Sequence, residues 1–438
     1  MIASIALLLL FCAHTRSAGL SNSKVNLNLT FSKLADQYDD LIFALNHKLS
    51  SSNSSSIRSV RSAYNSQNLT PVDFHRRFEQ TNTPVVIEAP KTTAPYWSAS
   101  GSVWDAEWWH QHCGNVKARV RIGTTHQPLW NWKFHDIKLS HYIDFVHGIV
   151  PTLHLDNSTM VVARNPNHTY LFDFPMALCP KEVLDDFVLP RWFVNDFLSL
   201  CVDPSGKSCP YAEIDWPSLF IGPAGFQNSP LHRDTLGSAF FSIQLVGTKT
   251  WRIFNPKDAP FLYPSLADDV HFDITNVHDL NQQRKYPLLQ HAQFVDVQVG
   301  PGELLFVPGG APHQATAHSG DITIMLGMNV VNLANVKGVI ATTKPKTIRR
   351  STSFKIAVAA GEDEVVKKEG GGDVVDSNGR DHDVPTQYTK AKYEIVHSFF
   401  SRYQNQFDQL VNWQAENMPW REFERRKIVI YPSENTHD

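Results

Sequence analysis

The sequence of 438 residues lacks long apolar runs, and neither sign of charge dominates it. No run approaches the ~18 residues that a helix needs to span a bilayer, so we expect no membrane-spanning segment. The 40 Lys and Arg residues nearly balance 43 Asp and Glu, which gives a formal net charge of −3. That balance argues against a protein that binds nucleic acid or a membrane surface through its net charge.

Cysteine is also scarce, and no pair has the CxxC spacing typical of zinc sites. Apart from Cys12 in the first apolar block, the chain has Cys113, Cys179, Cys201 and Cys209. This even number suggests disulfides in an oxidising compartment. Cys201 and Cys209 bracket a short polar loop and are plausible partners, which would leave Cys113 and Cys179 to pair. The alternative is four unrelated thiols.

The first residues predict export from the cytosol. An apolar block at residues 2–13 is followed by small residues, so residues 1–19 are predicted to be a signal peptide. The alternative is a buried strand or helix of the mature fold. Glycosylation sequons agree with export, and they lie at Asn28, Asn53, Asn68, Asn157 and Asn167. We therefore expect a location in the secretory pathway, either in the lumen of the endoplasmic reticulum or outside the cell.

Composition divides the remainder of the chain into four parts. Residues 20–70 are rich in Ser and Asn and predict a flexible segment with one helix. Residues 71–340 form the globular domain. Residues 343–388 are charged, Gly-rich and poor in aromatic residues, which predicts disorder. Residues 389–438 return to an amphipathic pattern and predict a helical segment that docks or forms a homodimer.

Within 71–340, short apolar runs alternate with Pro and Gly turns, which favours a sandwich or barrel of strands. The runs are PVVIEAP, VKARVRIG, SLFIGP, FFSIQLVGTKTWRIFNP, FVDVQVGPGELLFVPGG and ITIMLGMNVV. Helices are predicted between some of them, as at LSHYIDFVHGI. With 42% hydrophobic residues, 11 Trp and 26 Phe, the chain has enough apolar surface for a sizeable core.

The first candidate site residues are His232 and Asp234, in the segment SPLHRDTLG. One residue separates them, so an extended strand points both side chains the same way. An imidazole and a carboxylate on one face can bind the same metal ion. Alone, this pattern is more often two polar residues of a surface strand.

His313 is the candidate third ligand, because it follows the tight PGGAP turn and opens the next strand. Two His and one Asp leave the opposite face of a metal open. This is the facial triad of non-haem Fe(II) oxygenases, whose open positions receive a co-substrate and O₂.

Lys249 lies between the two metal-binding segments, after the Gly247–Thr248 turn. An inward lysine offers a fixed cation to a carboxylate. 2-Oxoglutarate has two carboxylates, one of which can chelate iron together with the keto oxygen while the distal one requires such a cation. A solvated hairpin lysine is the alternative, but the position between the metal segments favours the functional role.

Two strand faces complete the candidate site. Ser242, Gln244 and Val246 share the face that can line a cavity. On the strand after His313, Asn329 can contact the co-substrate or substrate, or it can cap the helix that follows. His318 is assigned to a turn rather than to the metal.

Three blocks together resemble the Jumonji-C (JmjC) proteins of the cupin superfamily, closest to the branch of lysyl hydroxylases and arginine demethylases. The resemblance covers roughly residues 75–335. Its most specific blocks are YLFDFPMALCPKEVLDDFVLPRWFVNDF, FIGPAGFQNSPLHRDTLGSAFFSIQLVGTKTWRIFNP and PGELLFVPGGAPHQA. It implies a mainly β fold with flanking helices: a double-stranded β-helix (jelly-roll) core with N- and C-terminal helical extensions.

The resemblance also implies Fe(II) and 2-oxoglutarate as cofactors. It implies iron ligands at His232, Asp234 and His313, and Lys249 on the distal carboxylate of 2-oxoglutarate. Ser242 and Asn329 are the other residues predicted at the cofactor.

Two positions depart from the family pattern. Ser242 stands where related enzymes often have Asn, and Gly327 stands where they have Thr. Both changes shorten the hydrogen-bonding reach toward 2-oxoglutarate. Either a water fills the space left by Gly327, or co-substrate binding is weakened or altered.

The leading hypothesis is an Fe(II)- and 2-oxoglutarate-dependent oxygenase. It would hydroxylate, or by hydroxylation demethylate, a side chain of a protein or peptide substrate in the secretory pathway. A second hypothesis is a non-catalytic JmjC-like luminal protein that binds metal and partners, which Gly327 and Ser242 favour. A third is a cupin that uses manganese or zinc, against which Lys249 argues.

Overall fold

The structure is a computed structural model, and it describes the globular part of the chain. The described residues are 61–65, 69–88, 97–98, 100–123, 133–155, 159–190, 192–193, 196–198, 217–226, 229–265, 270–318, 320 and 322–343. The predicted signal peptide, the predicted helix of the N-terminal segment, the predicted linker and the predicted C-terminal helical segment lie outside them, as do Cys201 and Cys209.

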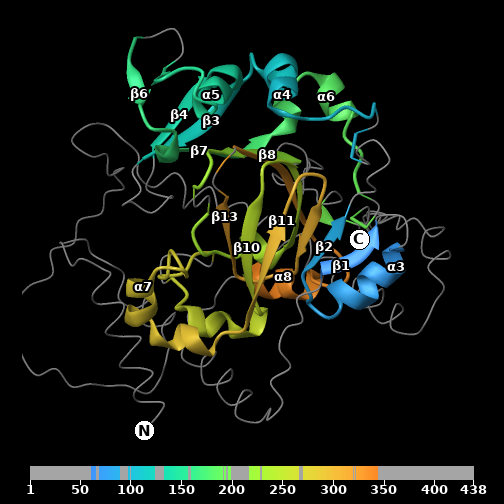
Figure 1. Cartoon of the computed structure of the whole chain (residues 1–438). Coiled ribbons are helices and arrows are strands. Elements are labelled where there is room, and N and C mark those ends of the chain that lie inside the picture. Colours follow the sequence, from blue (N-terminus) through green and yellow to red (C-terminus); the bar gives the residue numbers. More distant parts are fainter. Residues whose placement is uncertain are drawn as a thin grey trace, which may run out of the picture.

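A nine-stranded sheet forms the body of the fold (Figure 1), in the order β1-β2-β12-β9-β14-β8-β7-β3-β4. Its pairs are antiparallel except for β1 with β2. The strands are β1 Arg61–Asn65, β2 Val85–Glu88, β3 Lys117–Ile122, β4 Lys133–Lys138, β7 Thr169–Pro175, β8 Ser218–Gly222, β9 Ala239–Val246, β12 Leu304–Val307 and β14 Thr323–Val330. The apolar runs of the sequence become these strands, as predicted.

A smaller antiparallel sheet has the order β11-β10-β13, with β10 Lys249–Phe254, β11 Phe294–Val299 and β13 His313–Ala317. Buried side chains from both sheets pack together, among them Phe240, Leu305 and Met325 of the large sheet with Trp251 and Val297 of the small one. This apolar contact closes the two sheets into the predicted jelly-roll core. A separate hairpin pairs β5 Leu153–His154 with β6 Val161–Ala163.

Helices and turns contribute to a second apolar cluster with the other face of the large sheet. Phe74, at the end of the first helix, contacts Phe193 and Phe306 edge-on in this layer. The helices are α3 Pro71–Phe74, continued as a π-helix over His75–Glu79, then α4 Ala106–Cys113, α5 Leu139–Val146, α6 Lys181–Asp185, α7 Leu280–Lys285 and α8 Val336–Thr343. Short 3₁₀ turns occupy Pro166–His168, Met176–Leu178, Thr235–Gly237, Pro256–Leu262 and Pro287–His291. Within the described residues, no helix is both long and apolar enough to cross a membrane.

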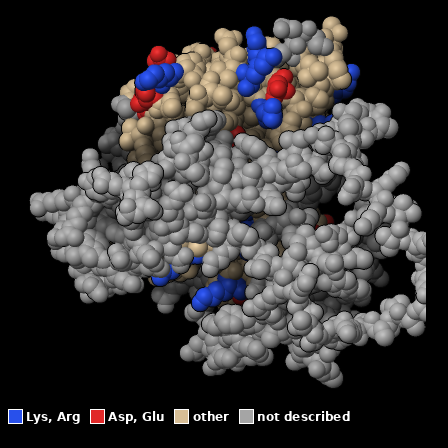
Figure 2. Space-filling view, turned by 180° about the vertical axis from the view of Figure 1, so that it is seen from behind, with Lys and Arg blue, Asp and Glu red and all other residues tan. Residues whose placement is uncertain are grey.

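A disulfide joins Cys113, at the end of α4, to Cys179, just before α6. Both residues are buried. This is one of the two pairings considered from the sequence, and it fixes the α4–α6 end of the molecule. On that end, Lys and Arg side chains lie among Asp and Glu (Figure 2), in keeping with the small net charge.

The connection from β10 to β11 is long and carries its own apolar cluster, which includes Phe261, Tyr263 and Tyr286. Its residues 270–275 run beside the segment that bears His232. Leu231 N–H donates to the Thr275 carbonyl at 3.3 Å, and Arg233 N–H donates to the Val270 carbonyl at 2.9 Å. The connection therefore forms one wall of the cavity that His232 lines.

Candidate metal centre and its cavity

Three predicted ligands come together between the two sheets. His232 and His313 form an isolated antiparallel bridge: His232 N–H donates to the His313 carbonyl at 3.1 Å, and His313 N–H donates to the His232 carbonyl at 2.7 Å. On its other side, His232 bridges to His271 of the β10–β11 connection. The backbone of the first ligand is thus held from both sides.

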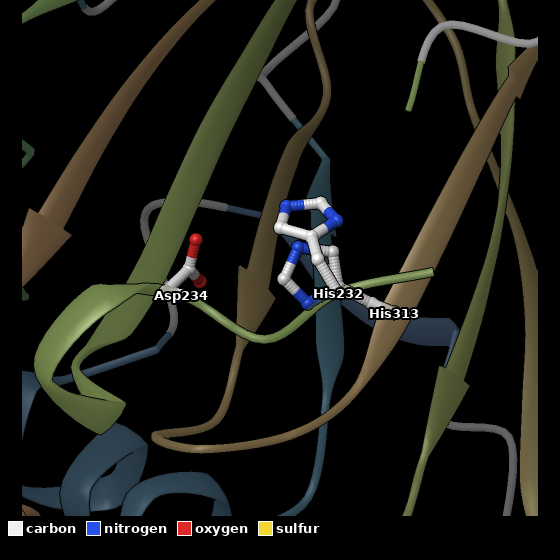
Figure 3. Close-up of side chains that lie close together, drawn as sticks. All are labelled: His232, Asp234 and His313. Carbon is white, nitrogen blue, oxygen red and sulfur yellow. The ribbon is translucent and has the colours of Figure 1, made fainter. Parts of the chain in front are cut away.

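One ligand atom from each of His232, Asp234 and His313 lies within 4.8 Å of the others. The two imidazole rings have centroids 4.4 Å apart, and the Asp234 carboxylate lies beside them (Figure 3). His313 is buried, whereas His232 and Asp234 are half-buried and line a cavity. Two nitrogens and one carboxylate on one side, with open space on the other, make a site for a metal with free coordination positions.

Backbone carbonyls orient both imidazoles. Nδ1 of His232 lies 2.9 Å from the Pro230 carbonyl, and Nδ1 of His313 lies 2.9 Å from the Ala311 carbonyl. A carbonyl only accepts, so each Nδ1 carries the hydrogen and donates it. Each Nε2 is therefore left with its lone pair for a metal.

The protonation states also suit a cation. Burial lowers the pKa of His232 to about 3, with a further contribution from the neighbouring His313, and burial lowers the pKa of His313 to about 4. Burial raises the pKa of Asp234 to about 6, against the opposing effects of His232 and of a hydrogen bond from Asn329. At neutral pH the imidazoles are neutral and the carboxylate is mostly ionised, which is the state that binds metal.

Asn329 holds the carboxylate ligand in place. Its side chain donates to Ser238 Oγ at 2.8 Å and also hydrogen-bonds Asp234. The sequence placed this residue at the cofactor or at a helix cap. In the structure it lines the cavity and supports Asp234, as carboxylate ligands usually require.

The cavity has a volume of about 290 Å³, which admits a side chain or a small dicarboxylic acid. Its wall is aromatic and apolar over much of its area, with charged groups at separate points. Its lining residues include Arg121, Tyr170, Arg233, Phe240, Lys249 and His271.

Lys249 points inward, as predicted. It is fully buried, and its Nζ has no hydrogen-bond partner among the described residues. The centroid of the Tyr170 ring lies 5.9 Å from Nζ. Burial lowers the pKa of this amine to about 7. An unpaired cation in such a place is costly unless an anion joins it.

The space at Gly327 is filled by aromatic rings. A Cβ built on Gly327 would meet Phe240 Cζ at 2.5 Å, Phe240 Cε2 at 2.7 Å and Phe220 Cε2 at 3.0 Å. The expectation that a water fills this space is therefore wrong. Cross-strand geometry is the reason, because β9 and β14 pair and bring the Phe240 ring over the glycine.

Ser242 faces Gly327 across the same strand pair, and it is buried with no hydrogen-bond partner for its Oγ in the described part of the chain. Of this strand face, Phe240 lines the cavity, whereas Ser242, Gln244 and Val246 are not among its described lining residues. The contact of Ser242 with the cofactor stays a prediction. His318, assigned to a turn, pairs its Nε2 with Thr250 Oγ1 at 2.6 Å, outside the cavity lining.

Sequence reasoning missed several wall residues. Tyr170 on β7 opens one of the family blocks, but nothing in that block predicted that its side chain lines the cavity, and His271 on the β10–β11 connection lies in no motif. Arg121 on β3 lies with its Cζ 3.9 Å from the Phe172 ring centroid and 4.6 Å from that of Phe134. Burial lowers the pKa of Arg121 to about 10, so it stays cationic.

These residues fit Fe(II) and 2-oxoglutarate. The donor set of two imidazoles and a carboxylate suits Fe(II) with open positions. Lys249 is buried in the same cavity, and its Nζ has no hydrogen-bond partner in the part of the chain that the structure describes, so it suits the distal carboxylate.

Comparison with known proteins agrees with this geometry. The sequence profile of a family described as a cupin-like domain matches residues 180–330. The chain is 26% identical over 277 residues to the mouse 2-oxoglutarate and iron-dependent oxygenase JMJD4, covering 60% of this chain and 59% of that protein. It is 37% identical over 95 residues to human HSPB1-associated protein 1, covering 21% and 19%. It is 32% identical over 92 residues to the JmjC domain-containing protein D of Dictyostelium discoideum, covering 21% and 20%.

The jelly roll and the matched profile support a protein of the cupin superfamily. Within that superfamily, the relatives support a likeness to the JmjC proteins. The match to mouse JMJD4 spans about three fifths of that relative, 59% of its length. The assignment to the branch of lysyl hydroxylases and arginine demethylases stays a prediction.

Proposed function

We propose that this chain is an Fe(II)- and 2-oxoglutarate-dependent oxygenase that hydroxylates a side chain of a protein substrate in the secretory pathway. One observation carries the proposal. The donor set of His232, Asp234 and His313 shares a cavity with Lys249, a buried lysine whose amine has no hydrogen-bond partner among the described residues. The names of the JMJD4 relatives, which describe oxygenases that depend on 2-oxoglutarate and iron, support it.

When bound, iron and 2-oxoglutarate supply the capacity to insert an oxygen atom from O₂ into a C–H bond. The chain supplies the rest. The metal would be held by three groups: Nε2 of His232, Nε2 of His313 and the Asp234 carboxylate. Asn329 fixes the carboxylate, and Lys249 receives the distal carboxylate of the co-substrate through a charge-assisted hydrogen bond.

Aromatic rings form a wall beside the metal ligands that would shield them from water and orient the substrate. Phe240 stacks at 6.4 Å from the His313 ring, with an interplanar angle of 11°. Trp251 lies 5.7 Å from the same ring, and both aromatic residues line the cavity. An enclosed, apolar setting strengthens the electrostatic contacts made within it and protects a reactive centre from solvent.

Conversion of 2-oxoglutarate to succinate by the purified, iron-loaded chain tests the proposal. We expect turnover in the wild type and its loss in Asp234→Ala. Lys249→Ala should raise the 2-oxoglutarate requirement strongly. Full activity of Asp234→Ala would refute the ligand assignment.

Protein substrates can be sought by mass spectrometry of a peptide pool, which detects products heavier by one oxygen atom. Demethylation by the same chemistry would instead release formaldehyde, which a separate assay detects. A product in the wild type that is absent from Asp234→Ala defines the target residue.

The secretory location is supported by the apolar block at residues 2–13, by the sequons and by the Cys113–Cys179 disulfide. Asn167, one of the sequon residues, is exposed in a 3₁₀ turn and is therefore accessible to glycosylation. Luminal or extracellular proteins are then the natural substrates. A shift in electrophoretic mobility on glycosidase treatment of the chain expressed in eukaryotic cells tests this location.

A non-catalytic metal-binding and interaction protein is the second candidate. The observations that favour it are the Phe240 ring packed over Gly327 and the absence of Ser242 from the cavity lining among the described residues. No turnover together with no 2-oxoglutarate binding would leave only this candidate.

A further inference from the structure

A second cavity lies next to the first and has a volume of about 250 Å³. Half of the eight described residues around it are glycines, and the others are small or polar except for one arginine. They are Asn82, Arg233, Gly237, Gly309, Gly310, Ala334, Asn335 and Gly338. We call this cavity the glycine groove.

Arg233 joins the two cavities, because it lines both. It stands between the ligands His232 and Asp234 in sequence. Its backbone is fixed to Val270, and its Cζ lies 5.8 Å from the Phe272 ring centroid. Arg233 is also the one charged residue among those described around the glycine groove. A chain that leaves the metal cavity toward the groove must therefore pass a cation.

The glycines leave room for a main chain to approach. A Cβ added at Gly310 or Gly338 would meet no heavy atom within 4 Å, so both positions border open space. Backbone that carries no side chain lets another backbone come close. The groove is also too large for a single small anion and has only one charge to hold one. It suits an extended polypeptide.

We propose that the glycine groove binds the stretch of the polypeptide substrate next to the target residue, with an acidic side chain of that stretch on Arg233. This inference rests on the proposed function. The target side chain enters the metal cavity, an Asp or Glu nearby in the substrate pairs with the guanidinium, and the backbone beyond it lies over the glycines. Arg233 is then a determinant of sequence specificity.

Gly338→Leu tests the groove with little risk to folding. Gly338 is exposed on α8, and leucine favours helices, so the variant should fold at least as well as the wild type. The new side chain fills the groove. Lys337→Leu is the matched control, because it adds the same side chain one position earlier on α8, outside the groove lining.

The probe comes from a chymotryptic digest of denatured secretory-pathway proteins, incubated with the iron-loaded wild-type chain, 2-oxoglutarate and O₂. The peptide that gives the most abundant oxidised product is synthesised in its unmodified form with a fluorescein label. Its binding to the chain is then measured by fluorescence anisotropy in the absence of O₂. We expect Gly338→Leu to weaken binding by about tenfold or more, and Lys337→Leu to leave it unchanged within about twofold.

The sequences of the products test the charge. Wild-type products should share Asp or Glu at one fixed offset from the oxidised residue. Arg233→Gln should lose that preference, and Arg233→Glu should exchange it for Lys or Arg.

Two failures are distinguishable. Products without an acidic preference, or wild-type affinity in Gly338→Leu, would overturn the glycine groove and leave the oxygenase proposal standing. If the wild type neither forms an oxidised product nor converts 2-oxoglutarate to succinate, the proposed function fails and this inference fails with it.

Discussion

His232 and His313 exchange two backbone hydrogen bonds, of 3.1 Å and 2.7 Å, although they come from segments far apart in the chain. This pair of backbone hydrogen bonds sets the distance between the two imidazoles before any metal binds. Asp234 is then aimed by Asn329 rather than by a strand pair. The centre is thus pre-formed at the histidines and depends on one side-chain hydrogen bond at the carboxylate.

Removal of the Asn329 side chain should weaken metal binding. In Asn329→Ala, Asp234 loses a hydrogen bond that favours its ionised form and fixes its orientation. We expect affinity for Mn²⁺, a redox-stable substitute for iron, to fall by about 10–100-fold. Calorimetric titration measures it, with Asn281→Ala on the exposed surface of α7 as control. Equal affinities in the two variants would contradict the supporting role of Asn329.

Binding of 2-oxoglutarate should take up a proton above pH 7. Burial depresses the pKa of Lys249 from 10.5 to about 7, so at pH 8 the amine is largely neutral in the ligand-free chain. A carboxylate beside it favours the charged form and raises its pKa. Titration of 2-oxoglutarate into the Mn²⁺-loaded chain at pH 8, in two buffers of different ionisation enthalpy, measures the uptake. Lys249→Arg stays protonated and should show none. If the binding enthalpy of the wild type is the same in both buffers, 2-oxoglutarate binding takes up no proton and the argument is refuted.

The same lysine should limit the stability of the ligand-free chain. Its folded pKa lies below its unfolded value, so its stability cost is complete below pH 7 and disappears as the pH rises past 10.5. We expect Lys249→Met to raise the free energy of unfolding at pH 7 by a few kcal/mol, measured by urea denaturation. The gain should shrink when the wild type is measured with saturating Mn²⁺ and 2-oxoglutarate. A loss of stability in Lys249→Met would contradict the argument.

Gly327→Ala should destabilise the fold by about 1–3 kcal/mol, because the new methyl overlaps the Phe240 ring. Phe240→Leu in the same chain should recover part of that loss, as a double-mutant cycle in urea would show. Gly338→Ala is the contrasting control, since its Cβ meets open space and a helix gains about 1 kcal/mol from the change. Additive effects of the two substitutions at 327 and 240 would argue against direct contact.

Loss of the Cys113–Cys179 disulfide should cost about 4 kcal/mol, because the bond closes a loop with a sequence separation of 66. The Cys113→Ala/Cys179→Ala chain should unfold at lower urea concentration than the oxidised wild type. Reductant should bring the wild type close to the variant and leave the variant unchanged. If reductant has no effect on the wild type, the bond contributes nothing to stability.

Much of the fold and the centre followed from local patterns. The apolar runs between Pro and Gly turns became strands, and the donor types at His232, Asp234 and His313 marked the metal cluster. Lys249 was found because a cation between two metal segments has a chemical reason to point inward.

The rest depends on pairing between distant segments. Tyr170, Arg121 and His271 reach the wall through β7, β3 and the β10–β11 connection. Tyr170 begins one of the family blocks, but no local pattern shows that any of the three side chains faces the metal cavity. The Phe240 ring fills the space beside Gly327, and this could be predicted only from the register of β9 on β14, in which Asn329 stands opposite Phe240. Single-residue comparison with a family pattern shows a missing hydroxyl, but only the register shows which ring takes its place.

The buried amine of Lys249 links the protein to metabolism in a way that does not require turnover. A ligand that binds only the native chain draws molecules out of the unfolded pool, where proteases act. Cells depleted of 2-oxoglutarate should therefore contain less of this protein even when its rate of synthesis is unchanged. Nutrient supply would then set its abundance as well as its speed.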